Sequence, residues 1–318
     1  MRTHIVAEFL ALSVLLAGVV NNSSAQEQPR AQTSENKQSG PRIEAVNMLF
    51  RYSPELAVLI VRLRGTLIPT EGHPVVTFND PASFSIGIEA AEIRVTASQL
   101  TALMNTSVTS SPKAKVKDLR ISASGNQLLI DGTMKEGVHV PFHAAADVGM
   151  TSDNRVRINV HQVKVGRLPV KGMLDALGLS MEDLIGQKGL KGMSVEGDSF
   201  VIDPRTAFPP PQIQGNITGV SVAGDGIVLK FGEGAPRMTM GEKGNYIAMR
   251  GGNIEYGRDE MFDSDLTMTD STPGDPFEFY LGEYWRQMVA GTIKVTPAKA
   301  LRMRVPDYSK IGNRAGAH

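Results

Sequence analysis

Histidine has a broad catalytic and metal-binding repertoire, and three histidines fall in one strand-rich stretch of this chain. His139 and His143 have the same strand parity, and His161 lies near a change in the apolar parity. A zinc ion holds its ligand atoms at about 2 Å. Strand positions four apart lie about 13 Å from one another, so these side chains could share an ion only across a severe bend. We therefore predict solvated histidines and no metal site.

Paired carboxylates are the next chemistry to consider. Glu182–Asp183 and Asp259–Glu260 are adjacent pairs, whereas hydrolysis needs an acid and a base that face each other across a substrate. The chain has no cysteine, no Gly-x-Ser-x-Gly elbow, no P-loop and no His-Glu-x-x-His motif. We therefore predict that it is not an enzyme and needs no cofactor. A hydrolase that uses scattered carboxylates is the weakest alternative.

The charges of the chain balance, with 33 basic and 33 acidic side chains. A nucleic-acid-binding protein would show a basic excess, so no nucleic-acid partner is expected. Lys113, Lys115 and Lys117 share one face of an expected strand. They are compatible with transient contact to anionic lipid head groups at a membrane surface, but protection of a strand edge and solubility explain them better.

The N-terminal residues predict export. Residues 1–25 combine Arg2, an apolar run from Ile5 to Val20 and small residues at Ser23 and Ala25, as a cleavable signal peptide does. Residues 26–41 are polar and predict a disordered linker. Without cysteine there is neither a disulfide nor a lipid-modified cysteine. We expect a periplasmic protein.

Strands dominate residues 42–232, which we expect to form one α+β domain. Ala57–Leu63 is an apolar, β-branched run, and apolar residues alternate over Phe84–Val95 and over Val138–Val148. Alternation continues from Val156 and changes parity before Val163, which predicts a β-bulge. Gly-Asn and Gly-Asp pairs separate several of these runs and predict hairpin turns.

Two helical signals interrupt the strands. Thr96 and Gln99 form a capping-box pair at the start of a short helix that we place at Thr96–Asn105. Leu168–Gly186 carries a continuous apolar stripe, with Pro169 suited to a first helical turn and Gly178 to a kink. We expect one bent helix or two short ones there.

Residues 233–318 predict a β-rich extension with one helix. The helix is expected to begin at Pro276, after Asp275 as N-cap, and to end before Gly291. It carries Trp285, the single tryptophan. The expected strands are Tyr246–Met249, Asn253–Tyr256, Leu266–Thr269 and Leu301–Val305.

These elements predict an α+β fold in which a mostly antiparallel, strongly curved sheet wraps on a few short amphipathic helices. Such a sheet can enclose an elongated apolar groove, and methionines on the helical faces suit varied acyl chains. A fully closed dry core is the alternative. The residues expected to line the groove are Val140, Phe142, Val148, Val170, Met173, Leu174, Leu177 and Leu184.

The order of several motifs resembles the LmeA-type family of exported bacterial phospholipid-binding proteins. The resemblance covers about residues 93–231, and residues 244–308 lie outside the family pattern. The matching segments are Ile93–Leu103, Val116–Ile121, Leu168–Leu174, Val195–Asp198, Val201–Pro204 and Ile213–Val222. The resemblance implies a sheet wrapped on helices, similar to tubular lipid-binding folds, with a diacyl lipid as ligand and no enzymatic site.

We therefore predict a periplasmic protein that binds or shuttles a phospholipid or another acyl lipid in an apolar groove. The alternative is a non-catalytic scaffold of the cell envelope. In that alternative Phe277, Tyr284 and Trp285 of the C-terminal helix form the interaction surface.

Overall fold

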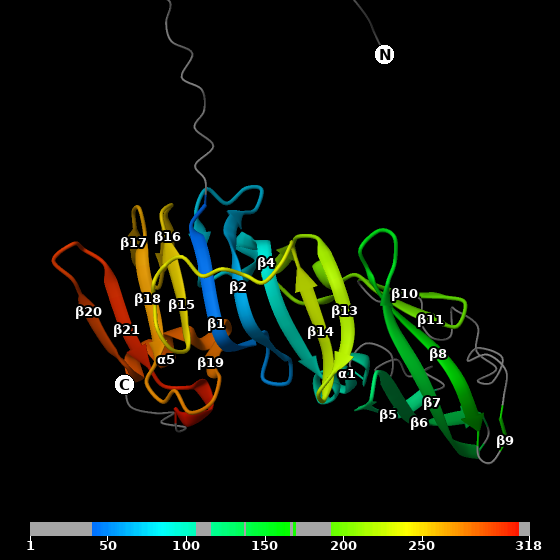
Figure 1. Cartoon of the computed structure of the whole chain (residues 1–318). Helices are drawn as coiled ribbons and strands as arrows, with labels where there is room; N and C mark the ends of the chain where they lie inside the picture. Colours follow the sequence, from blue (N-terminus) through cyan, green and yellow to red (C-terminus); the bar gives the residue numbers. More distant parts are fainter. Residues whose placement is uncertain (1–39, 106–115, 137, 166–167, 170–191, 312–318) are drawn as a thin grey trace, which may run out of the picture. The chain divides into compact units, whose positions relative to one another are not determined.

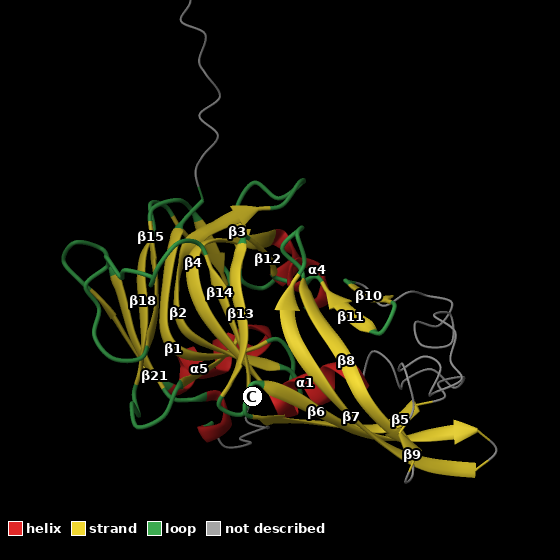
Figure 2. Cartoon of the chain, turned by 45° about the vertical axis from the view of Figure 1, so that its right-hand side comes forward, coloured by secondary structure: helices red, strands yellow, loops and turns green. Residues whose placement is uncertain are grey.

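The computed structural model describes residues 40–105, 116–136, 138–165, 168–169 and 192–311 (Figure 1). These residues belong to one unit, and most of them lie in strands, with only short helices between (Figure 2). The predicted sheet-dominated α+β fold, with curled antiparallel sheets and few helices, is confirmed. The predicted signal peptide and nearly all of the predicted linker lie outside the described residues. No described helix has the length and apolar character needed to span a membrane.

The larger sheet brings the two ends of the described chain together. Its strand order is β13-β14-β4-β2-β1-β15-β18-β21-β20, with β12 paired to β4 and β19 paired to β1 (Figure 1). The strands are β1 (Arg42–Arg51), β2 (Ala57–Pro69), β4 (Phe84–Thr96), β12 (Gln212–Gln214), β13 (Ile217–Ala223), β14 (Gly226–Phe231), β15 (Tyr246–Arg250), β18 (Asp265–Asp270), β19 (Phe277–Tyr280), β20 (Thr292–Val295) and β21 (Leu301–Val305). The strands after Phe231 thus continue the sheet that the earlier strands begin.

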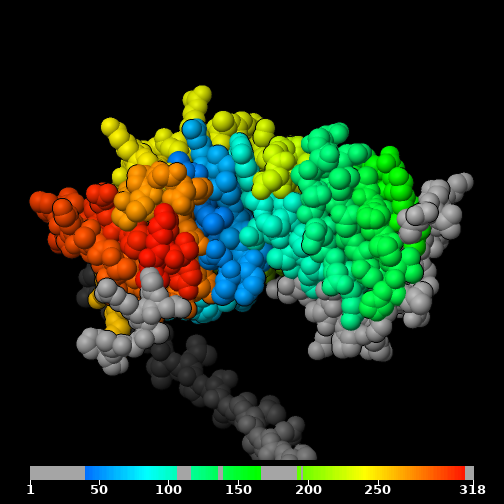
Figure 3. All heavy atoms as spheres, turned by 90° about the horizontal axis from the view of Figure 1, so that it is seen from below, coloured from blue at the N-terminus to red at the C-terminus, as the bar shows by residue number. Residues whose placement is uncertain are grey.

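Strand β1 changes partner halfway along one edge. Residues 42–46 pair antiparallel with β15, and residues 48–51 pair parallel with β19. Asn47 lies at the change with φ of 47°, a left-handed conformation that asparagine tolerates better than most residues. Its side chain donates to Asn245 Oδ1 at 2.9 Å. Figure 3 shows the orange and red C-terminal residues directly beside the blue N-terminal ones.

The second sheet contains the long alternating strand of the sequence. Its order is β10-β11-β8-β7-β6-β5, with β9 paired to β8. The predicted bulge is confirmed, because the register shifts opposite residues 143–145 and Gln162 has φ of 51°. The strands are β5 (Val116–Ser124), β6 (Gln127–Glu136), β7 (Val138–Met150), β8 (Val156–Val165), β9 (Leu168–Pro169), β10 (Met193–Glu196) and β11 (Ser199–Ile202).

The remaining elements are short. The third sheet has the order β17-β16-β3. These strands are β3 (Val76–Thr77), β16 (Ile254–Tyr256) and β17 (Asp259–Met261). The described helices are α1 (Ala97–Met104), α4 (Pro204–Ala207) and α5 (Tyr284–Ala290), together with the 3-10 turns η1 (Pro81–Ser83), η3 (Leu281–Glu283) and η4 (Tyr308–Lys310).

Two predicted helix starts are wrong. Leu168–Pro169 forms β9 and pairs with Lys164–Val165, because the residue before a proline disfavours the helical conformation. The rest of that predicted helix, residues 170–186, lies outside the described residues. Phe277–Tyr280 is a strand and the helix begins only after it. Phe277 and Phe279 are both buried against the core, so the alternation outweighed the Asp-Pro capping signal.

A buried carboxylate holds the connection from β14 to β15. This connection, residues 232–245, runs past β4, β2 and β1 (Figure 1). Glu44 of β1 has no exposed surface, and it accepts hydrogen bonds from Thr239 N and Oγ1 at 2.7 Å and from Met240 N at 3.1 Å. Burial alone would raise the pKa of Glu44, but these hydrogen bonds outweigh it and keep the pKa below its usual value.

Candidate functional site

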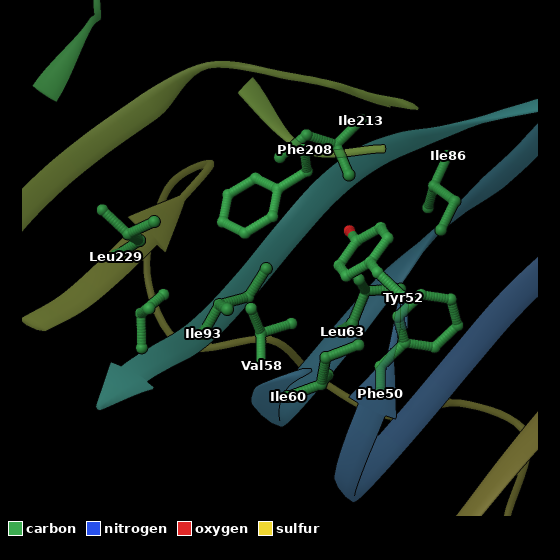
Figure 4. Close-up of a pocket in the computed structure, with 11 residues that line it drawn as sticks. Phe50, Tyr52, Val58, Ile60, Leu63, Ile86, Ile93, Phe208, Ile213 and Leu229 are labelled. Carbon is green, nitrogen blue, oxygen red and sulfur yellow. The ribbon is translucent and has the colours of Figure 1, made fainter. Parts of the chain in front are cut away.

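The candidate site is an apolar slot at one end of the larger sheet, where β1, β2, β4 and β14 meet the segment after α4. Every residue that lines it is aliphatic or aromatic (Figure 4). The lining residues are Phe50, Tyr52, Val58, Ile60, Leu63, Ile86, Ile93, Val95, Phe208, Ile213 and Leu229. Its free space is about 20 Å³, which is room for about one water molecule. The slot is therefore narrow in this state.

Tyr52 gives the slot its polar atom. Its ring stacks on Phe208 with ring centroids 5.3 Å apart and meets Phe50 edge-on at 4.9 Å. The hydroxyl oxygen points toward the side chains of Phe208 and Ile213 (Figure 4). It makes no hydrogen bond with any residue that the structure describes. Burial among apolar side chains raises the pKa of this phenol, so it stays protonated and able to donate a hydrogen bond.

A wider vestibule adjoins the slot and has about 510 Å³ of free space. Ligand pockets in proteins commonly have about 300–1,000 Å³. Most of its walls are apolar, and Glu55 is the one ionisable group among the residues that line it. The lining residues are Ser53, Glu55, Leu56, Ala102, Leu103, Thr206, Ala207, Phe208, Pro209 and Pro210. This combination of apolar walls with a polar rim suits an amphiphile.

Phe208 is the one residue that lines both spaces. It is half-buried and follows directly after α4, with Pro209 and Pro210 behind it. The prolines restrict the backbone on one side of this residue. The Phe208 side chain therefore forms a wall that the slot and the vestibule share.

Local hydrogen bonds fix the three segments around the vestibule. Thr96 Oγ1 accepts from Gln99 N at 3.2 Å and caps α1, as predicted. The Gln99 side chain does not return to the cap. Its Oε1 accepts from Ala57 N at 2.8 Å and ties α1 to the start of β2.

The third segment around the vestibule, which carries Phe208, is held in place by contacts of α4. Asp203 caps this short helix by accepting from Arg205 N at 3.0 Å, and it also pairs with the Arg205 guanidinium at 2.7 Å. Gly192 packs beneath Thr206 and Ala207 with φ of 71°, where a Cβ atom would lie 2.5 Å from Ala207 N. These contacts hold the wall that carries Phe208.

The lining residues predicted from the sequence lie in the second sheet or outside the described residues. Val140, Phe142 and Val148 are on β7 of the second sheet, and none of them lines the slot or the vestibule. Phe142 is buried over Gly132, and the two valines are half-buried. The lipid-lining role of these three residues stays a prediction. The others, Val170, Met173, Leu174, Leu177 and Leu184, lie outside the described residues.

Two of the three histidines that the sequence analysis considered lie beside different carboxylates. His143 Nδ1 lies 2.5 Å from Asp131 Oδ1, and His161 Nε2 lies 3.0 Å from Asp147 Oδ2. Each of these two histidines therefore has its own carboxylate partner. Of the predicted carboxylate pairs, Asp259–Glu260 is exposed on β17, and Glu182–Asp183 lies outside the described residues. Of the three lysines, Lys117 is half-buried on β5 and the other two lie outside the description.

One carboxylate group missed by the sequence reasoning has metal-like spacing. Within the described ranges, Asp270, Asp275 and Asp307 place ligand oxygens within 4.8 Å of one another. Lys310 Nζ lies 2.6 Å from Asp307 and 3.1 Å from Asp275, so an ammonium already offsets part of the negative charge of this group. Hydrogen bonds to these two carboxylates raise the pKa of Lys310. The cluster therefore holds the C-terminal η4 turn in place.

Comparison of this chain with protein-family models, with curated proteins and with solved structures finds no match to any of them.

Proposed function

We propose that this protein binds an acyl lipid non-catalytically, with the chain in the vestibule and its end in the slot beyond Phe208. One observation carries the proposal: a slot lined by aliphatic and aromatic side chains adjoins a vestibule large enough for a ligand. Each methylene that leaves water contributes about 0.8 kcal/mol, so several methylenes suffice for stable binding. The sequence resemblance to exported phospholipid-binding proteins supports a phospholipid as the ligand and the periplasm as the location.

The chemistry of the rim supports an amphiphile rather than a purely apolar molecule. Glu55 is exposed at the vestibule, and its carboxylate is held by the Ser53 hydroxyl at 3.1 Å. A negative rim attracts a head group that carries a cationic amine and repels a free fatty-acid carboxylate. A zwitterionic lipid therefore fits the site better than a fatty acid.

Blocking the vestibule tests the proposal. Ala102 of α1 is half-buried in its wall, and Ala102→Phe would fill part of the space at little cost to the helix. We expect the affinity for a fluorescent lysophosphatidylcholine, measured by titration of the delipidated full chain, to fall about tenfold or more.

Ala223→Phe is the matched control, because Ala223 is exposed at the end of β13 and lines neither space. It should bind as the unaltered protein does, and circular dichroism should show both variants folded. Equal affinity of the Ala102→Phe variant, or an unaltered protein that neither copurifies with lipid nor takes it up, would contradict the proposal.

A further inference from the structure

Exposed apolar side chains concentrate at one edge of the larger sheet. Eight large apolar residues are exposed in the described part of the chain, and four of them lie within residues 285–295. These four form what we call the edge patch: Trp285, Val289, Ile293 and Val295, which are 56%, 80%, 47% and 69% exposed. Large exposed apolar groups gathered in one place mark interaction surfaces.

The fold places these four residues on two touching elements. Trp285 and Val289 are one helical turn apart on α5, so they share a side of that helix. Ile293 and Val295 share a side of β20, the last strand of the sheet, and α5 packs against β20. Only Gly291 separates the helix from the strand, so all four residues lie within one short stretch of the chain at the sheet edge.

Basic side chains predominate in the stretch of sequence that carries the patch. Residues 286–306 contain five basic side chains and no acidic one. Arg286 is neutralised by Glu283 at 2.7 Å and Arg302 by Asp265 at 2.8 Å. The other three are exposed and form no ion pair with a described residue: Lys294, Lys299 and Arg304. The patch is therefore apolar, and its positive rim lies on the opposite face of the β20–β21 hairpin, at Lys294 and Arg304, and at the turn of the hairpin, at Lys299.

We propose that the edge patch docks this protein on an anionic lipid surface. Tryptophan prefers the boundary between head groups and acyl chains, and the aliphatic neighbours would enter with it, while the basic side chains on the opposite face of the hairpin and at its turn attract the anionic surface, as in an amphipathic membrane-surface segment. A second copy of the chain fits less well, because pairing two β20 edges would bring two positive rims together. The inference concerns a surface outside the slot and vestibule and does not depend on what they bind.

The single tryptophan makes the docking directly measurable. Trp285 is the only tryptophan in the chain, so its emission reports on the edge patch alone. Adding vesicles of phosphatidylcholine with phosphatidylglycerol to the full chain should shift this emission to shorter wavelength. Brominated acyl chains should quench it. Pure phosphatidylcholine vesicles, or high salt, should weaken both effects, because the charge term is screened.

Variants separate the patch from the rest of the surface. Lys294→Gln and Lys299→Gln should each lower vesicle partitioning about fivefold, since one basic side chain near an anionic membrane contributes about 1 kcal/mol. The double variant Val289→Ser and Ile293→Ser keeps the fluorophore and should abolish the shift. Phe262→Ser and Lys230→Gln are the matched controls, because both residues are exposed outside residues 285–295, and they should bind vesicles normally.

Three outcomes would overturn the proposal. These are no emission shift with anionic vesicles, equal loss of binding in the control variants, or a self-association of the chain that Trp285→Ala abolishes. A stable protein cross-link at the patch without vesicle binding would likewise replace it with a scaffold role. If vesicles bind normally but lipid titration of the vestibule fails, the proposed function fails and the docking surface stands.

Discussion

At the scale of single residues, the Tyr52 hydroxyl forms no hydrogen bond with a residue that the structure describes. A tyrosine hydroxyl among apolar side chains normally finds a partner. Ser194 Oγ is the fully buried side-chain atom without a partner in the described part of the chain, so the Tyr52 hydroxyl is not a buried polar group left unsatisfied. Tyr52 therefore contributes its ring, rather than its hydroxyl, to the apolar slot.

Replacing Tyr52 by phenylalanine separates folding from binding. We expect Tyr52→Phe to leave the free energy of unfolding of the lipid-free protein unchanged or to raise it by up to about 1 kcal/mol, because no internal hydrogen bond is lost. Lipid affinity should stay unchanged, because the end of an acyl chain in the slot offers the hydroxyl no acceptor. Chemical denaturation and lipid titration measure the two effects. A large loss of stability would show that Tyr52 serves the core instead.

At the scale of elements, the sequence predicts strands and caps well and partner changes poorly. The alternation of β7, the Thr96 cap of α1 and the strand Leu301–Val305 are local patterns, and all three predictions are confirmed. Phe277–Tyr280 was predicted as helix because its burial depends on parallel pairing with β1, more than 200 residues earlier. Local spacing carries no signal for such a contact.

The candidate site escaped prediction for the same reason. Its walls come from the β1–β2 turn, α1 and the α4 segment, which are far apart in sequence. The local sequence of each segment predicts only an ordinary turn or a short helix. A signal existed in the run Phe208-Pro-Pro-Pro, where an aromatic residue precedes a rigid segment, but its meaning depends on Tyr52 lying beneath it.

Because β1 changes partner at Asn47, we expect the stability of the protein to depend on which residue replaces this asparagine. A β-branched residue is strained at a φ of 47°, and Asn47→Val also removes the hydrogen bond to Asn245. We expect this variant to lose about 2–3 kcal/mol of stability in chemical denaturation. Asn47→Gly should lose less, because glycine accepts the left-handed conformation. Equal losses would mean that the hydrogen bond, and not the backbone, matters.

At the scale of the whole molecule, buried carboxylates set the response to acid. Burial raises the pKa of Glu44 and of Glu278, but hydrogen bonds outweigh it and leave both pKa values below the usual one, with Arg51 adding to the effect at Glu278. A lowered folded-state pKa contributes stability that is complete above the unfolded-state value, about 4.3, and is lost as the pH falls through the folded-state value. The protein should therefore lose stability below about pH 4.5.

Glu44→Gln tests this acid response. At neutral pH the variant should be less stable by about 1–3 kcal/mol, because the amide cannot accept all the hydrogen bonds from Thr239 and Met240. Its stability should then decline less steeply on acidification, as measured by urea denaturation across the pH range. Glu71→Gln is the control, since Glu71 is exposed. An unchanged pH profile would show that Glu44 does not contribute.

The position of β1 in the larger sheet also bears on how this chain is made. One edge of β1 pairs with β2, which follows directly in the chain, but the other edge pairs with strands that begin at Tyr246 and Phe277, so a ribosome must finish most of the polypeptide before that second edge is covered. Nascent chains that carry an unpaired strand edge are prone to join one another. Synthesis of this protein should thus include a long interval in which chaperones, rather than its own fold, protect residues 42–51.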